Sequence, residues 1–303
     1  MSMDQVETGA FAGRGVASGQ TDVIRVVSWN IARGCQFDAV TEFLSDTKAD
    51  VIILQETDRN SRRTRYRNVA KEISQKLGMN YAFGIEFQEL AQGSHHSPAY
   101  HGQATLSSWP ISHPRILRFQ RQSKFWRPYW WLPNLPSLQR RLGERMALLT
   151  YISIGYRTVA VYNLHLESRR DDSLRCGQLN EFLEDANRHS PNLPVVAAGD
   201  FNFDITQPCP ASAIADSSFH NPFAGIGMKT TRPPRFGRSK AVDWILIRGI
   251  LRATAPQVHS SVTASDHYPL SVQLHLPQSA ELSADAVSSP ENLGCPDLVE
   301  LSK

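Results

Sequence analysis

The stretch that decides the fold is VVAAGDFNF, residues 195–203, where a run of β-branched and small residues ends in Asp200 and Asn202. Such a run predicts a buried strand, and the polar residues that follow it are expected at the rim of a sheet, where ligands bind. The same pattern, an apolar run that stops at an acid, an amide or an imidazole, recurs along the chain. The sequence therefore predicts several strands whose polar ends meet at one site.

Strands outnumber helices in this chain. The segments with β-branched runs are 23–31, 51–57, 81–87, 146–154, 158–166, 193–201, 241–248 and 270–276. The segments with helical spacing of apolar residues are 37–44, 69–77 (ending at Gly78) and 176–186 (beginning near Asp172 or Ser173). Gly155-Tyr156-Arg157 separates two of the strands and predicts a hairpin turn. Many strands and few helices favour packed sheets with helices outside over a single doubly wound sheet.

Six strand ends carry residues that suit phosphate and metal chemistry. They are Asn30, Glu56, His165, Asp200 with Asn202, Asp243, and Asp266 with His267 before the last strand. Any one of them is explained by a solvated strand end, but six together favour a site. Mg²⁺ takes hard oxygen ligands, which Asn30 and Glu56 offer. Phosphoryl transfer needs an oriented water and donors for the phosphate oxygens, and the remaining acids, amide and histidines supply them.

Six motifs occur in a fixed order along the chain: VVSWNIARG, DVIILQETD, YNLHLES, VVAAGDFNF, AVDWILI and SDHYPL. Together they resemble the endonuclease/exonuclease/phosphatase family, which includes DNase I, over roughly residues 23–276. The resemblance implies a four-layer α/β sandwich, in which two packed mixed β-sheets are flanked by helices and the site lies at one rim. GQATLSSWPI, residues 102–111, is similar to a family segment that more often reads GNAILSR-x-PI, and departs from it at Gln103 and Ser108.

The resemblance also implies a metal site. Asn30 and Glu56 would hold Mg²⁺, with Mn²⁺ as an alternative, and Asp266 would join them. No cysteine or histidine cluster has the spacing of zinc ligands, since His95, His96 and His101 are expected in a loop. The expected cofactor is therefore a divalent cation held by oxygen ligands.

The same resemblance assigns catalytic roles. Asp200 would align or deprotonate the attacking water, and Asn202 would bind the scissile phosphate. His165 would contact the phosphate or the leaving group. His267 would be the second histidine, oriented by Asp243, because an acid bound to one imidazole nitrogen fixes the tautomer.

Three groups near these motifs allow two interpretations each. Glu86 or Glu89 is expected to support His165 from behind. Arg145 is either a substrate-binding arginine at a strand start or a solvated surface residue. The arginines among residues 59–67 form either a basic wall beside the site or a solvated loop.

Residues 118–143, RFQRQSKFWRPYWWLPNLPSLQRRLG, form an insertion with six basic residues, no acid and three tryptophans. Its three prolines exclude a long regular helix. Its aromatic side chains either fold back on the core, or stack on nucleic-acid bases through Trp130 and Trp131, or lie at a membrane interface. We refer to this segment below as the insertion.

The composition of the 303 residues, 41% hydrophobic and with a net charge of +3, is that of an ordinary globular protein. Residues 1–21 and 277–303 are expected to be mobile tails around a catalytic domain over 22–276. The four scattered cysteines favour free thiols over disulfides. The sequence has no run of 18 apolar residues and no signal-peptide pattern at its start, so we expect a cytoplasmic protein.

These observations predict a metal-dependent hydrolase of phosphodiesters. Nucleic acid is the first expectation for the substrate, and a lipid or inositol phosphate at a membrane surface is the second. An inactive binding module is less favoured, because no catalytic position carries an inert residue. No stable protein partner is expected.

Overall fold

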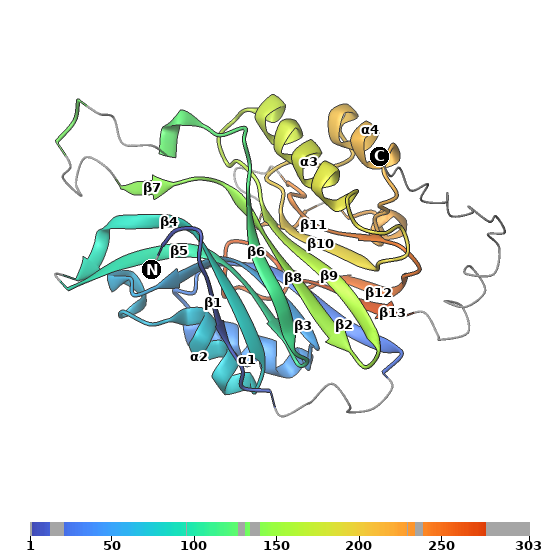
Figure 1. The fold of residues 1–303 in the computed structure, drawn as a ribbon, viewed down its shortest axis with the longest axis horizontal. Coiled ribbons are helices and arrows are strands. Elements are labelled where there is room, and N and C mark those ends of the chain that lie inside the picture. Colours follow the sequence, from blue (N-terminus) through green and yellow to red (C-terminus); the bar gives the residue numbers. More distant parts are fainter. Residues whose placement is uncertain are drawn as a thin grey trace, which may run out of the picture.

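Two mixed β-sheets lie face to face in the computed structural model, which describes residues 2–12, 21–94, 96–126, 131–133, 140–228, 230–233 and 239–276 (Figure 1). The eight-stranded sheet has the order β1 (Val6–Gly9), β4 (Asn80–Ser94), β5 (Ser97–Ser107), β3 (Val51–Arg59), β2 (Val23–Arg33), β13 (Leu270–His275) and β12 (Arg252–Val258), and β7 (Arg141–Gly143) pairs with β4. The five-stranded sheet has the order β11 (Asp243–Arg248), β10 (Val195–Asp200), β9 (Arg157–His165), β8 (Met146–Ile154) and β6 (Ile111–Arg118).

Helices cover the outer face of each sheet. Helices α1 (Phe37–Thr47) and α2 (Val69–Leu77) share an apolar cluster with the larger sheet. Helix α3 (Asp172–Ala186), with α4 (Pro208–Ala215) beside it, does the same for the smaller sheet. A third cluster, which includes Ile53 and Val161, fills the space between the sheets. Three short 3-10 turns, η1 (Arg62–Thr64), η2 (Lys124–Trp126) and η3 (Ala224–Ile226), lie in connections. The predicted four-layer sandwich is confirmed.

Local sequence signals explain the element ends. Helix α2 begins after Asn68, whose side chain accepts a hydrogen bond from the Lys71 amide, and it ends at Gly78 with a φ of +62°. The hairpin between β8 and β9 turns at Gly155, as predicted. The N-cap of α3 was predicted at Asp172 or Ser173 and is Asp171, whose carboxylate accepts a hydrogen bond from the Leu174 amide.

Several strands escape the β-branched pattern. Strand β5 lies inside the larger sheet, so His101 is on a strand and not in the predicted loop. Polar and small residues fill its central positions, and they hide the alternation that marks a strand. The prediction of a mobile tail over 1–21 was wrong for residues 6–9, which pair with β4 as strand β1. Residues 277–303 lie outside the described residues.

The cysteines differ from the prediction of free thiols. Cys176 and Cys209 form a disulfide between α3 and α4, with their Cα atoms 6.4 Å apart. Cys35 is an exposed free thiol, and Cys295 lies outside the described residues. No helix within the described ranges is both long enough and apolar enough to cross a bilayer.

Candidate active site

Three adjacent strand ends of the smaller sheet bring acids and a histidine together. The parallel pairing of β9 with β10 sets His165 beside Asp200, and the antiparallel pairing of β10 with β11 sets Asp243 on the other side of Asp200. All three side chains are buried, with 2–3% of their surface exposed. The sequence prediction that polar strand ends converge is thus confirmed for these residues.

The larger sheet contributes Asn30 and Glu56 from two parallel neighbours. The register of β2 with β3 shifts after Asn30, and that of β3 with β5 shifts at the position of Glu56. Glu56 has a φ of +50°, in the left-handed region that side chains other than glycine rarely adopt. The Asn30 amide Nδ2 donates to Asp200 Oδ2 at 3.1 Å, which joins the two sheets at the site. Bulges of this kind re-aim side chains next to active sites.

His267 and Asp243 form the predicted pair. His267 Nδ1 lies 2.9 Å and 2.8 Å from the two carboxylate oxygens of Asp243, and its Nε2 lies 3.7 Å from Asp200 Oδ2. Thr231, which the sequence analysis did not identify, donates to Asp243 Oδ2 at 2.5 Å. Burial lowers the pKa of His267, but the nearby carboxylates of Asp243 and Asp200 outweigh it and raise the pKa to about 9. The two carboxylates therefore favour the protonated imidazole.

His165 pairs with Glu86, one of the two acids expected to support it. His165 Nδ1 lies 3.1 Å from Glu86 Oε2, and its Nε2 lies 3.8 Å from Asp200 Oδ2. Glu86 comes from β4, so this pair also bridges the sheets. Burial opposes the ionisation of Glu86, but the charges of Arg145 and His165 outweigh it and lower its pKa to about 2. Glu89, the other expected acid, instead contacts Arg63 and Arg141.

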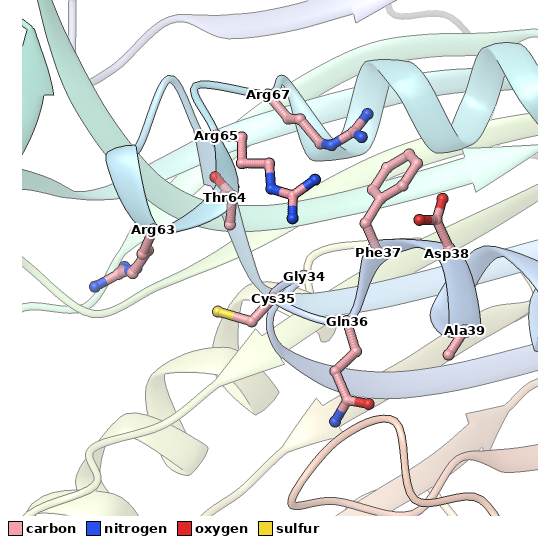
Figure 2. Close-up of a pocket in the computed structure, with 10 residues that line it drawn as sticks. All are labelled: Gly34, Cys35, Gln36, Phe37, Asp38, Ala39, Arg63, Thr64, Arg65 and Arg67. Atoms are coloured by element: carbon pink, nitrogen blue, oxygen red, sulfur yellow. The ribbon is translucent and has the colours of Figure 1, made fainter.

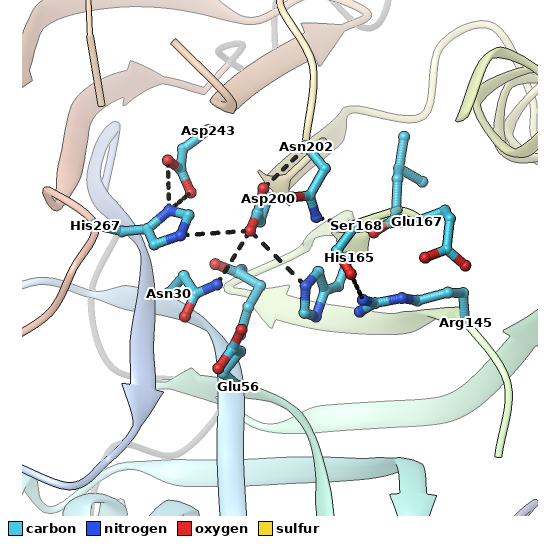
Figure 3. A network of polar contacts seen from close by, with 12 residues as sticks. Asn30, Glu56, Arg145, His165, Glu167, Ser168, Asp200, Asn202, Asp243 and His267 are labelled. Atoms are coloured by element: carbon cyan, nitrogen blue, oxygen red, sulfur yellow. Dashed lines mark hydrogen bonds and ion pairs between the residues drawn. The ribbon is translucent and has the colours of Figure 1, made fainter. Parts of the chain in front are cut away.

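Asp200 is the centre of the arrangement (Figure 3). Its Oδ1 accepts from the backbone amide of Asn202 at 2.9 Å, and its Oδ2 faces Asn30 and both histidines. Asn202 has a φ of +58°, and its side-chain amide donates to the Leu166 carbonyl at 3.0 Å. The carboxylate of Asp200 thus faces Asn30, Asn202 and both predicted histidines.

Arg145 lies behind His165, directly before β8, and is only 2% exposed, which excludes the interpretation as a solvated surface residue. Its Nη1 donates to Glu86 Oε1 at 2.6 Å and its Nη2 donates to Ser168 Oγ at 2.8 Å. The structure therefore places it where it holds the acid that holds His165, and its predicted contact with substrate remains a prediction.

The insertion divides into a packed part and an exposed part. Phe119 is buried in the core of the smaller sheet, and Trp126 packs 5.0 Å from Phe87 between ring centroids. Phe125 and Trp131 are 52% and 63% exposed. Trp130 lies outside the described residues. Among the described residues of the insertion, the interpretation of aromatics folded back on the core is therefore right for Phe119 and Trp126 and wrong for Phe125 and Trp131.

The surroundings of Glu56 fit a divalent cation. Its carboxylate is 3.8 Å from the guanidinium of Arg33, the one ion pair that it forms in the part of the chain described here. Burial opposes ionisation, but the charges of His101, His165 and Arg33 outweigh it and lower the pKa of Glu56. His101 Nδ1 contacts Asp58 at 2.9 Å, whereas its buried Nε2 has no hydrogen-bond partner among the described residues. An ionised oxygen ligand beside an unsatisfied buried nitrogen suits a hydrated hard cation.

Three further acids bear on the metal assignment. Asp266 is bound by Arg232 at 2.6 Å, and its side chain is 42% exposed. Asp200, Asp243 and His267 also present ligand atoms within 4.8 Å of one another. However, Asp243 already binds His267 Nδ1 with both oxygens, so a cation there would compete with that pair. The assignment of the cation to Glu56 and Asn30 stays a prediction.

The arginines that follow Glu56 are mostly structural. Arg59, Arg63 and Arg67 form ion pairs with Glu7, Asp58 and Glu72. Arg63, Arg65 and Arg67 also line a cavity of about 310 Å³ together with Cys35, Phe37 and the residues around them (Figure 2). The interpretation as a basic wall is thus limited to Arg62 and Arg65, which are exposed.

Comparison with known proteins agrees with this geometry. The model of the endonuclease/exonuclease/phosphatase family matches residues 27–267, and the chain belongs to this family. It is accordingly a phosphoesterase. A comparison with curated proteins found no match.

Solved structures share the fold. An endonuclease/exonuclease/phosphatase from Beutenbergia cavernae DSM 12333 is 17% identical with a TM-score of 0.62, over 86% of this chain and 73% of its own. TDP2 from Caenorhabditis elegans is 19% identical with a TM-score of 0.58, over 84% and 74%. A mannosyl-6-phosphatase from Bacteroides thetaiotaomicron VPI-5482 is 16% identical with a TM-score of 0.56, over 83% and 99%. At these identities the likeness concerns the fold.

Proposed function

We propose that this chain hydrolyses phosphodiester bonds with the help of a divalent cation, by in-line attack of water. The observation that carries the proposal is the position of two imidazoles around one carboxylate. The Nε2 atoms of His165 and His267 lie 3.8 Å and 3.7 Å from Asp200 Oδ2, and a buried acid holds the Nδ1 atom of each ring. A phosphate placed beside Asp200 would meet both rings.

The residues around Asp200 divide the reaction among them. Asp200 aligns the attacking water and accepts its proton as the new bond to phosphorus forms. His267 is cationic, since its pKa is raised to about 9, so its Nε2–H stabilises negative charge on the phosphate. His165 contacts the phosphate or the leaving oxygen through Nε2. The Asn202 side-chain amide has two N–H groups, of which one donates to Leu166 and the other serves the scissile phosphate.

Asn30 and Glu56 would hold the cation, and Asp266 would join them after leaving Arg232. Mg²⁺ is the first choice and Mn²⁺ the alternative, because the donors are oxygens. When bound, the cation supplies positive charge that neutralises the phosphate oxygens. Asp243 keeps its position beside His267 and fixes which ring nitrogen faces the phosphate.

Nucleic acid is the proposed substrate. Exposed Phe125 and Trp131 stand in a segment rich in arginine and lysine, and stacking combined with positive charge suits single-stranded nucleic acid. A lipid or inositol phosphate is the second candidate, because an exposed tryptophan such as Trp131 also suits a bilayer interface.

The proposal is tested by hydrolysis of plasmid DNA, single-stranded DNA, RNA, sphingomyelin and inositol phosphates, each with Mg²⁺ and with EDTA. Magnesium-dependent cleavage of a nucleic acid supports it. Cleavage confined to the lipid or the inositol phosphates selects the second candidate. Turnover that is unaffected by EDTA would refute the metal assignment.

Glu56→Gln tests the metal ligand directly. The substitution removes one anionic oxygen, so we expect Mg²⁺ affinity and activity to fall together while the unfolding temperature changes little. Loss of a residue that only supports a metal ligand lowers metal affinity by about 10–100-fold, and loss of a direct ligand should lower it at least as much. Calorimetric titration with Mg²⁺ measures the affinity, and Glu72→Gln at an exposed ion pair is the matched control. Wild-type Mg²⁺ affinity in Glu56→Gln would contradict the assignment.

A further inference from the structure

Residues 166–169, which follow His165, contact first the candidate active site and then the insertion. The Leu166 carbonyl accepts from the Asn202 side chain at 3.0 Å. The next residue, Glu167, is fully buried and accepts from the indole Nε1 of Trp126 at 2.9 Å. Catalytic residues and insertion are therefore connected through a few consecutive residues.

Arg169, at the end of this segment, lies against the exposed ring of Phe125 in the insertion. The guanidinium carbon of Arg169 lies 4.1 Å from the ring centroid of Phe125, which is 52% exposed. Arg169 is itself exposed, and the structure gives its guanidinium no acidic partner among the described residues. The pair thus presents a flat aromatic and cationic surface to solvent, four residues from His165.

The part of the insertion that carries Phe125 is held firmly against the catalytic body. The Gln122 side chain exchanges two hydrogen bonds with the Arg145 backbone, at 2.7 Å and 2.9 Å. Trp126, next to Phe125, packs 5.2 Å from the Arg145 guanidinium. Because Arg145 also binds Glu86, the position of Phe125 is fixed relative to His165. A preorganised ring of this kind binds a ligand with little loss of conformational entropy.

We propose that Phe125 and Arg169 form a subsite that stacks an unpaired nucleic-acid base next to the scissile phosphate. The inference rests on the proposed function and deepens it, because it selects single-stranded nucleic acid. Bases stack on aromatic side chains and on guanidinium planes, and a cation beside the ring also attracts the adjoining phosphate. Lys124 and Arg121 are exposed in the same segment and extend the positive charge. An acyl chain would instead favour an apolar surface without a guanidinium over the ring.

Binding of a short fluorescent oligo-deoxythymidine in EDTA tests the subsite without cleavage. Phe125→Ala should raise the Kd about tenfold, because stacking on one aromatic is worth about 1–3 kcal/mol. Phe125→Trp should retain the affinity, and Arg169→Gln should weaken binding and reduce its dependence on salt. Tyr156→Ala is the matched control, since Tyr156 is 57% exposed but lies at the opposite end of β9. Unfolding temperatures verify that each variant is folded.

An oligonucleotide with abasic sugars separates stacking from charge. We expect Phe125→Ala to have no effect on its affinity, because no base is present to stack. Three results overturn the proposal: no binding by the wild type, equal binding by Phe125→Ala, or an equal loss on the abasic chain. If Phe125→Ala loses binding to phosphatidylserine vesicles while its oligonucleotide affinity is unchanged, the proposal is also overturned, in favour of a membrane contact.

Cleavage of the same oligonucleotide with Mg²⁺ distinguishes the two proposals. If the wild type binds through Phe125 and does not cleave, the subsite stands and the proposed function fails. If the wild type cleaves and Phe125→Ala binds and cleaves equally well, the proposed function stands and the subsite fails.

Discussion

Two buried carboxylate–histidine pairs face Asp200, and they are built differently. Each pair joins the two sheets: Asp243 lies at the start of β11 in the smaller sheet, and His267 directly precedes β13 of the larger sheet. Thr231 donates to the second oxygen of Asp243. Glu86 and His165 come from different sheets, and Glu86 is shared with the guanidinium of Arg145. Thr231 completes the hydrogen bonds of the first pair, whereas Arg145 connects the second pair to the insertion.

The difference assigns the pairs different roles. His267 lies between Asp243 and Asp200, whose negative charges outweigh the opposing charge of Arg232 and raise its pKa to about 9. It therefore brings positive charge to the phosphate. The charge of Glu86 is already balanced by Arg145, and its pKa is lowered to about 2. We infer that Glu86 mainly fixes the tautomer and direction of His165. Equal geometry at the two rings therefore does not imply equal electrostatics.

The largest effect is expected where both pairs meet. Asp200→Asn removes the carboxylate that faces both imidazoles, so kcat should fall about 10²–10⁴-fold with the fold retained. We expect a decrease of kcat in the same range for His165→Ala. Steady-state kinetics at saturating Mg²⁺, with circular dichroism as the folding control, make the measurement. Near-wild-type turnover in both variants would remove the mechanism.

Replacement of the two acids separates the pairs. Glu86→Gln removes the carboxylate that binds the buried Arg145 and leaves it mainly the charge of Glu167 nearby, so the free energy of unfolding should fall by at most about 3–5 kcal/mol. Asp243→Asn removes the partner of His267, whose charge is also supported by Asp200, and we expect a loss of activity that exceeds its loss of stability. Urea unfolding and kinetics of both variants test the contrast. If Glu86→Gln and Asp243→Asn lost equal stability, the contact of Glu86 with Arg145 would not make the two pairs energetically different.

The pH dependence of unfolding sharpens this contrast. The folded pKa of Glu86, about 2, lies below its ordinary value of 4.5, so its ionisation stabilises the fold above pH 4.5. That contribution is lost as the pH falls from about 4.5 to about 2. Glu86→Gln should therefore lose less stability than the wild type over this range. Parallel curves for the two proteins would contradict the assignment.

The sequence predicts residues that local patterns mark and misses those that packing brings together. Asp200 and His165 follow β-branched runs, and the sheet register then places them side by side. Thr231 has no such signal, because it reaches Asp243 from a connection between elements. Strand β5 is hidden because its central residues are polar or small although they are buried. The Cys176–Cys209 contact depends on how α4 packs beside α3, which residue spacing alone does not reveal.

The smallest effect is expected at Trp126, where the insertion joins the second pair. Trp126→Phe keeps an aromatic ring against Phe87 and Arg145 but loses the hydrogen bond to Glu167. One hydrogen bond contributes about 1 kcal/mol, so kcat should fall by about fivefold at most.

A double-mutant cycle decides whether this loss acts through His165. If Trp126 positions Arg145 and thereby Glu86, its substitution should have little further effect on kcat in a Glu86→Gln background. In an Asp243→Asn background the two losses should add, because in the described part of the chain the Asp243–His267 pair forms no hydrogen bond or ion pair with the insertion. Additive losses in both backgrounds would show that Trp126 serves only the local packing. In that case the insertion would not distinguish the two pairs.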